Sequence, residues 1–207
     1  FRQHGLLQYS LILPRFNRML ALNAPEARHL RSRVPEADVR LADTPACAAG
    51  SPTAPVLLFA SLYTSDAFDK RNHLPLITEV LQWAAAHGLT VVVRPHPRED
   101  TGFWANHFAM TQVDHSPRRF ADCLAQWTPT FVVSWYSTTL VDCLMSDALP
   151  VLLGAGSEPL LSDLVFPLEE VALSWEQDRD LMATLTKEPA QHAAERDRRR
   201  RLAFGAW

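Results

Sequence analysis

The sequence predicts an α/β fold in which helices cover both faces of a parallel sheet. Apolar runs of strand length, at 56–60, 89–93, 130–133 and 150–153, are unbroken rather than alternating with polar residues. Strands that are buried on both faces require such runs. Segments with helical spacing or helix-start signals lie between them, and this alternation is typical of a parallel sheet joined by crossover helices.

The chain before the first of these runs carries weaker signals. Residues 18–22 have the composition of a short strand, and Asn23 is placed to cap a following helix. The small residues and prolines of 43–55 show no apolar period, which predicts a linker. Because the chain does not begin with Met, we expect it to be a piece of a longer protein. The predicted parts are the end of an amino-terminal domain or connecting segment at 1–42, the linker at 43–55, and the main domain at 56–207.

In the main domain, helix signals follow the strands in order. Leu74 to His87 has apolar residues at helical spacing, and Gly88 is placed to end that helix. The other expected helices lie between later strands or after the last one, at 118–127, 138–147, 176–187 and 190–202.

The composition excludes several classes of protein. Lys and Arg number 20 and Asp and Glu number 23, so the net charge of −3 lacks the basic excess of a nucleic-acid binder. No apolar stretch reaches the ~18 residues of a membrane span. Three cysteines without a CxxC pair predict a reducing, cytoplasmic compartment and no structural zinc. GxGxxG, GxxxxGK[ST] and HExxH are absent, so we predict no dinucleotide fingerprint, no P-loop and no metal site.

Polar residues that follow the strands form the candidate site, because ligands of open parallel sheets bind beyond the carboxyl ends of the strands. Arg94-Pro95-His96-Pro97 comes directly after the run at 89–93. Each proline holds the residue before it extended, so His96 is displayed at the sheet edge, where it can donate to a phosphate or carry a proton. Arg94 adds a charge-assisted donor. The alternative is a proline-rich turn with a solvent-facing histidine.

Hydroxyl side chains follow the run at 130–133 and precede a helix. Backbone N–H groups and the positive dipole end at a helix start favour an anion, and added hydroxyls would suit a nucleotide phosphate. The alternative is simple capping, with Thr139 and Asp142 at the spacing of a capping box. The hydroxyl residues are Ser134, Ser137, Thr138 and Thr139.

A third polar loop follows the run at 56–60. Its residues Tyr63, Thr64 and Ser65 could contact a base or a phosphate. Taken alone, the sequence favours the alternative, an ordinary loop between a strand and a helix.

Together these motifs resemble the carboxyl-terminal domain of bacterial capsule and cell-surface polysaccharide glycosyltransferases of the GT-B fold. RPHP after one buried strand, and FVVSWYSTTLVDCLMSDALPVLL further along, are similar to the His-Pro and Ser motifs of bacterial sialyltransferases, capsule Kdo transferases and CDP-glycerol glycerophosphotransferases. Gln3-His4-Gly5 resembles the QHG segment of capsule enzymes. The resemblance implies a Rossmann-like domain, the carboxyl-terminal half of a GT-B enzyme, that binds the donor nucleotide.

The resemblance also implies roles for individual residues. His96 would be catalytic, bonding the donor phosphate and stabilising the departing nucleotide with N–H, O–H and imidazolium donors around it. Asp142 would contact the ribose or cap the helix, and His4 would line the cleft from the other side. The residues that would hold the phosphate at the helix start are Ser137 and Thr138, with Ser134 and Thr139.

The activity implied is that of a glycosyltransferase in capsular or cell-surface polysaccharide synthesis. Its substrates would be a CMP- or CDP-linked donor and a polysaccharide or lipid-linked acceptor, with inversion and without cofactor or metal. The alternatives are a UDP-sugar epimerase of the same architecture and a non-catalytic Rossmann-like assembly module. No residue of the chain is assigned as general base.

The protein would be cytoplasmic and could take part in a capsule-synthesis complex. The basic-then-apolar end at 195–204 could contact the anionic inner membrane as a peripheral protein. The alternative, a solvated helix end with arginines near the negative dipole terminus, is favoured by so short a run.

Overall fold

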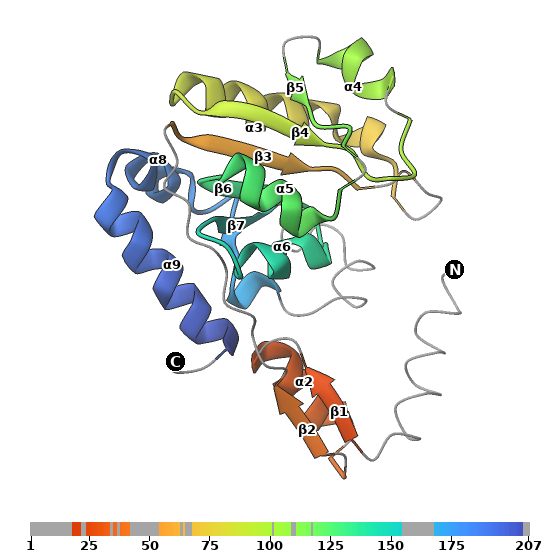
Figure 1. The fold of residues 1–207 in the computed structure, drawn as a ribbon, viewed down its shortest axis with the longest axis vertical. Helices are drawn as coiled ribbons and strands as arrows, with labels where there is room; N and C mark the ends of the chain where they lie inside the picture. The colour runs from red at the N-terminus through yellow and green to blue at the C-terminus, as the bar shows by residue number, and fades with distance from the viewer. Residues whose placement is uncertain are drawn as a thin grey trace.

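The structure is a computed structural model of residues 1–207 (Figure 1). It describes residues 18–21, 24–33, 35–36, 38–41, 54–62, 64, 68–100, 102–108, 111–116, 118–154 and 168–204. The predicted linker at 43–55 falls almost wholly outside the described residues, as does the cap at Asn23.

Six parallel strands form the main sheet, in the order β5-β4-β3-β6-β7-β8. Counted from β3, this is the 3-2-1-4-5-6 order of the Rossmann fold, and its switch point lies between β3 and β6. The predicted α/β fold with a parallel sheet is therefore confirmed. The strands are β3 (Val56–Ala60), β4 (Thr90–Arg94), β5 (Gln112–Val113), β6 (Phe131–Ser134), β7 (Leu149–Leu152) and β8 (Leu173–Ser174).

Helices cover both faces of this sheet (Figure 1). Successive residues of a strand point to opposite faces, so Leu57 and Phe59 join one apolar cluster while Leu58 and Ala60 join the other. This two-sided burial is why the strand sequences are unbroken apolar runs. The first cluster includes residues of α3 (Leu74–Ala86), α4 (Gly102–His107) and α8 (Arg179–Lys187), and the second those of α5 (Phe120–Trp127), α6 (Thr138–Cys143) and α9 (Pro189–Phe204).

The helix ends show where local signals succeed and fail. Gly88 has φ +74°, a conformation that favours glycine, and it follows α3 as expected. In contrast, α6 stops at Cys143 rather than at the predicted 147. The Ser146 hydroxyl donates to the Cys143 carbonyl at 2.7 Å, and this turn bond replaces further helical bonds. Two short 3-10 segments, η2 (Lys70–His73) and η3 (Leu168–Glu170), precede α3 and β8.

A small β-α-β unit precedes the main sheet. Strand β1 (Arg18–Ala21) pairs in parallel with β2 (Asp38–Leu41), and α2 (Ala24–Arg33) connects them. Helix α2 lies against α9, and Arg28 forms an ion pair with Glu170 (Figure 1). The strand at 18–22 and the helix after it were predicted, whereas β2 was not, because its sequence DVRL is half charged.

Candidate functional site

The carboxyl ends of β3, β4 and β6 lie side by side at one edge of the sheet. Each of these strands is followed by one of the polar loops that the sequence singled out. Strand β3 sits between the other two, and the Ser61 N–H continues the β3–β4 pairing by donating to the Arg94 carbonyl at 2.9 Å. The candidate site therefore lies at the switch point, which is where open parallel sheets commonly bind ligands.

The turn after β4 fixes the His96 imidazole. The Glu99 N–H donates to the His96 carbonyl at 2.8 Å, which closes the turn, and the Arg98 N–H donates to His96 Nδ1 at 3.1 Å. A backbone N–H can only donate, so Nδ1 must be the acceptor and unprotonated. In the neutral ring the proton is therefore on Nε2, which makes Nε2–H the donor of His96.

The charge of His96 is set by burial first. Burial lowers the pKa of His96 below its ordinary value, the charge of Glu99 raises it, and the charges of Arg98 and Lys70 lower it. The ring is therefore neutral at pH 7. The imidazolium expected from the sequence is replaced by a neutral Nε2–H donor.

Arg94 is not presented to a ligand in this structure. It is the last residue of β4, and its Nη1 donates to the carbonyl of Asp114 at 3.1 Å and to the Ser116 hydroxyl at 3.0 Å, while Nη2 donates to the Arg118 carbonyl at 2.7 Å. It also pairs with the Asp114 carboxylate at 3.2 Å, and its side chain is only 10% exposed. Arg94 therefore ties β4 to the loop after β5, and we leave it out of the phosphate site.

Ser134 also has a structural partner. It is the last residue of β6 rather than the first of the loop, and it is fully buried. Its hydroxyl donates to the Ala60 carbonyl at 2.7 Å, which joins the ends of β6 and β3 at the switch point. Because its single proton is used in this bond, Ser134 is also left out of the phosphate site.

The start of α6 keeps the hydroxyls that could meet a ligand. Ser137 is the N-cap, and its Oγ accepts from the Thr139 N–H at 3.3 Å and from the Thr139 hydroxyl at 2.9 Å. These two bonds use the acceptor capacity of Ser137, so its own proton is left to donate. Thr138 is exposed beside it. Ser137 and Thr138 thus present hydroxyls at the helix start.

Asp142 differs from both sequence expectations. The capping alternative paired it with Thr139, but the cap is Ser137. The resemblance placed it in the first turn of the helix, but it lies in the second turn of Thr138–Cys143. Desolvation raises the pKa of Asp142.

Of the remaining candidates, only Thr64 lies among the described residues. Thr64 is partly buried in the connection after β3. His4, Tyr63 and Ser65 lie outside the described residues.

The sequence analysis missed two residues that hold the turn after β4. Glu99 is buried with its backbone bonded to His96, and it forms an ion pair with the buried Lys70 of η2. The His-x-x-Glu spacing is the signal that could have identified Glu99. Lys70 is far away in the sequence and carries no such signal.

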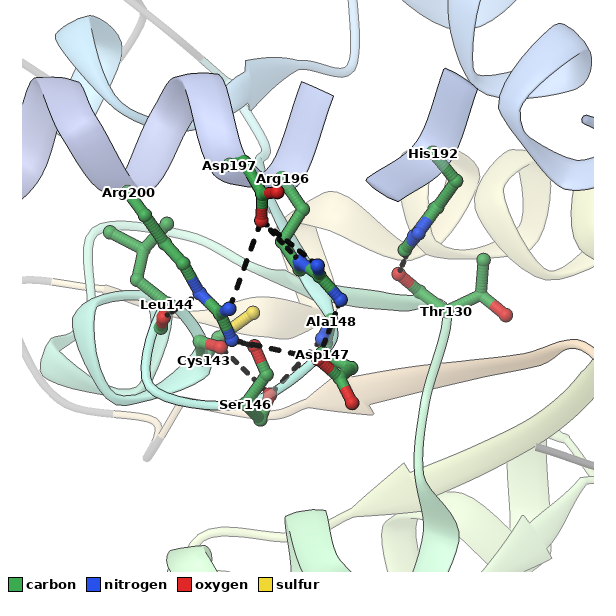
Figure 2. A network of polar contacts seen from close by, with 10 residues as sticks. All are labelled: Thr130, Cys143, Leu144, Ser146, Asp147, Ala148, His192, Arg196, Asp197 and Arg200. Atoms are coloured by element: carbon green, nitrogen blue, oxygen red, sulfur yellow. Dashed lines mark hydrogen bonds and ion pairs between the residues drawn. The ribbon is translucent and has the colours of Figure 1, made fainter. Parts of the chain in front are cut away.

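Two of the arginines near the chain end bind the protein instead of solvent. Figure 2 shows Arg200 and Arg196 of α9 reaching the turn after α6. The Arg200 Nε donates to the Leu144 carbonyl at 2.9 Å, and Arg196 pairs with Asp147 at 2.6 Å. Arginine on the last carbonyls of a helix is favourable. Both arginines hold α6 in place, so these two side chains are not part of a solvated helix end.

Among the described residues, no three His, Cys, Asp or Glu side chains are grouped to hold a metal ion. No helix among them is long and apolar enough to cross a membrane.

Comparison with known proteins identifies a fold. No protein-family model and no curated protein matches the sequence. The structure of TarM is similar at 10% identity with a TM-score of 0.51, over 95% of this chain and 41% of that chain. A mutant of S. aureus TarM in complex with fondaparinux, alpha-GlcNAc-glycerol and UDP is similar at 11% identity with a TM-score of 0.51, over 92% and 41%. The pneumococcal O-GlcNAc transferase GtfA, in complex with UDP and GlcNAc, has 12% identity and a TM-score of 0.48, over 94% and 43%.

The likeness to TarM concerns architecture. This chain shares the Rossmann-like α/β arrangement of TarM. The chain spans 41% of the length of TarM. The likeness shows a fold that this chain shares with part of TarM.

Proposed function

We propose that this chain is the donor-binding part of a glycosyltransferase that uses a CMP- or CDP-linked donor to build a capsular or cell-surface polysaccharide. The observation that carries the proposal is the placement of His96 and the hydroxyls of Ser137 and Thr138 at one sheet edge. Strand β3 separates the ends of β4 and β6, so these two strand ends lie about 10 Å apart by strand spacing. Side chains reaching from both ends can meet at one phosphate group.

These residue types suit the departure of a nucleotide. Negative charge grows on the phosphate oxygens as the bond to the sugar breaks, and donors that are already oriented stabilise that charge. The Nε2–H of neutral His96 would supply one donor, and the hydroxyls of Ser137 and Thr138 would supply others. The ring is oriented before the ligand arrives, because Nδ1 is held by the turn. We assign no general base among these residues.

The alternative to a cytidine nucleotide is a uridine nucleotide. The TarM mutant structure contains UDP, which favours a UDP-sugar transferase or a UDP-sugar epimerase as the second candidate. In a non-catalytic assembly module, Ser137 would act only as a helix cap and His96 only as part of a turn. The preferred base and the effect of losing His96 separate these three functions.

Calorimetric titration with CMP, CDP, UMP, UDP and inorganic phosphate tests the proposal. Cytidine nucleotides should bind, and His96→Ala should weaken them by ~1–3 kcal/mol, since a charged phosphate loses a donor. His107→Ala is the matched control, because His107 is exposed on α4. Affinity should also rise as the pH falls through the pKa of His96, where the ring gains charge. Uridine preference would establish the second candidate, and absence of binding, or indifference to His96→Ala, would contradict a nucleotide site.

A further inference from the structure

We propose that the buried ion pair of Glu99 and Lys70 positions the His96 imidazole and so sets which nitrogen donates to the ligand. The hydrogen bond from this donor to a nucleotide rests on the proposed function, whereas the positioning of the ring does not. The positioning itself concerns Glu99, Lys70 and the turn after β4. Glu99 and Lys70 act through His96 and are positioning residues.

The Glu99 carboxylate is surrounded by donors. Its Oε2 accepts from the His96 N–H at 3.0 Å, and its Oε1 accepts from the Trp104 indole N–H at 3.0 Å and from the Lys70 ammonium. Its side chain is 0% exposed, and that of Lys70 is 5% exposed. Each of the three groups can only donate, so Glu99 is ionised and both of its oxygens are in use.

The ion pair joins two loops of the candidate site. Lys70 begins η2 in the connection after β3, where Asp69 caps the segment, while Glu99 belongs to the turn after β4. The Lys70 ammonium also lies over the Phe103 ring at 4.5 Å from its centroid. The lysine is therefore held on two sides, and it fixes the carboxylate that holds the His96 backbone.

Holding a loop with a buried ion pair costs desolvation free energy. Desolvation of two charges offsets much of their attraction, so apolar residues of similar size often stabilise a fold as well or better. Apolar residues would not accept the His96 N–H. The arrangement is thus better suited to orienting His96 than to stabilising the fold, with the Arg98 N–H on Nδ1 as the result.

The pair also acts on the charge of the ring. The groups that affect His96 besides burial are Glu99, which favours the charged ring, and Arg98 and Lys70, which oppose it. Removing the charge of Glu99 leaves the two cations unopposed. The pKa of His96 should then fall, and the turn should lose its hold on Nδ1.

Glu99→Gln tests the proposal, because the new side chain has nearly the same shape but one of its ends is an amide NH₂. That NH₂ faces a donor in either orientation, so the three contacts cannot all survive. Nitrogen-15 NMR of the histidine rings in the full chain reads the tautomer and the pKa directly. Wild-type His96 should be neutral as Nε2–H, whereas His87 and His107 should be Nδ1–H, because their Nδ1 atoms lie 2.8 Å from backbone carbonyl oxygens.

In Glu99→Gln, His96 should become a mixture of tautomers with a lower pKa, while His87 and His107 stay unchanged. The matched control is Glu79→Gln on α3, which removes a half-exposed partner of Arg179 and should leave His96 unchanged. A folded Glu99→Gln whose His96 keeps one tautomer and the wild-type pKa would overturn the positioning role. If Glu99→Gln does not fold, Trp104→Phe removes one donor to Glu99 and keeps both charges, so it should give a mixture of His96 tautomers without the fall in pKa, and a single tautomer would overturn the positioning role.

Nucleotide titration connects the positioning to the ligand. Glu99→Gln should weaken binding about 10-fold or more, and the double variant His96→Ala/Glu99→Gln should be no weaker than His96→Ala alone. Additive losses would overturn an action through His96. If wild type binds no nucleotide, the proposed function fails, and the NMR result still decides the positioning.

Discussion

The carboxylate of Asp114 is the acceptor that holds the loop after β5, and its replacement by the isosteric amide has a calculable effect. Its Oδ1 accepts from the Ser116 N–H at 2.9 Å and from Arg94 at 3.2 Å, and its Oδ2 accepts from the Trp127 indole at 3.0 Å and from the Cys123 thiol at 3.3 Å. Burial raises the pKa of Asp114, but the hydrogen bonds from Ser116, Trp127 and Cys123 outweigh it. The pKa of Asp114 therefore lies well below its ordinary value.

An asparagine can accept at only one of these two oxygen positions. If the amide nitrogen takes the Oδ1 position, it faces the donors of Ser116 and Arg94. If the amide nitrogen takes the Oδ2 position, it faces the donors of Trp127 and Cys123. Two hydrogen bonds are lost either way, at a site where the Asp114 side chain is 5% exposed. A buried donor left unpaired costs about 1–3 kcal/mol. We expect Asp114→Asn to lower the free energy of unfolding by roughly 3 kcal/mol at pH 7.

The loss should depend on pH with a fixed sign. A carboxyl whose pKa is lowered by folding stabilises fully above its unfolded pKa of about 4, and the stabilisation is lost as the pH falls toward the folded pKa. The gap between wild type and Asp114→Asn should therefore be full at pH 7 and smaller at pH 3. Urea unfolding followed by tryptophan fluorescence measures it, with the partly exposed Asp122→Asn as a control within ~0.5 kcal/mol. A gap under about 1 kcal/mol at pH 7, or the same gap at pH 3, would refute the reasoning.

Two further predictions concern the face covered by α5, α6 and α9. Arg200→Ala should lower the free energy of unfolding by ~2 kcal/mol, because Arg200 donates to the carbonyls of Leu144 and Ser146, whereas the exposed Arg201→Ala should stay near wild type in the same urea assay (Figure 2). Burial, followed by the hydrogen bond to Asp114, raises the pKa of the Cys123 thiol to about 12. Peptide mapping after alkylation at pH 8 should therefore find Cys123 unlabelled in the native protein and labelled in urea, and equal labelling would contradict its burial.

The long central elements could be predicted from the sequence because their signals are local. The strands β3, β6 and β7 are buried throughout and β4 is buried at its centre, so apolar residues occupy most positions and the runs stand out. Helix α3 shows its apolar spacing and its terminal glycine within one segment. The edge strands β5 and β8 are only two residues long, and no run of that length carries a pattern.

The sequence predicted where the candidate residues lie on the sheet. The contacts in the structure then corrected which of these residues belong to the candidate site. That His96 and Ser137 follow parallel strands was enough to place them at one edge of the sheet. The structure shows that Arg94 donates to the carbonyls of Asp114 and Arg118, and that the Ser134 hydroxyl donates to the Ala60 carbonyl. These partners are distant in the sequence, so local patterns could not predict them.

The sequence by itself determined the layers, the order of the central elements along the chain and the sheet edge that carries the candidate residues. Periodicity and proline act within a few residues, so a linear pattern is sufficient to predict them. The tertiary structure alone decided which polar side chains remain for a ligand. A donor or acceptor satisfied by a distant backbone atom is no longer available, and that pairing exists only after the strands have met.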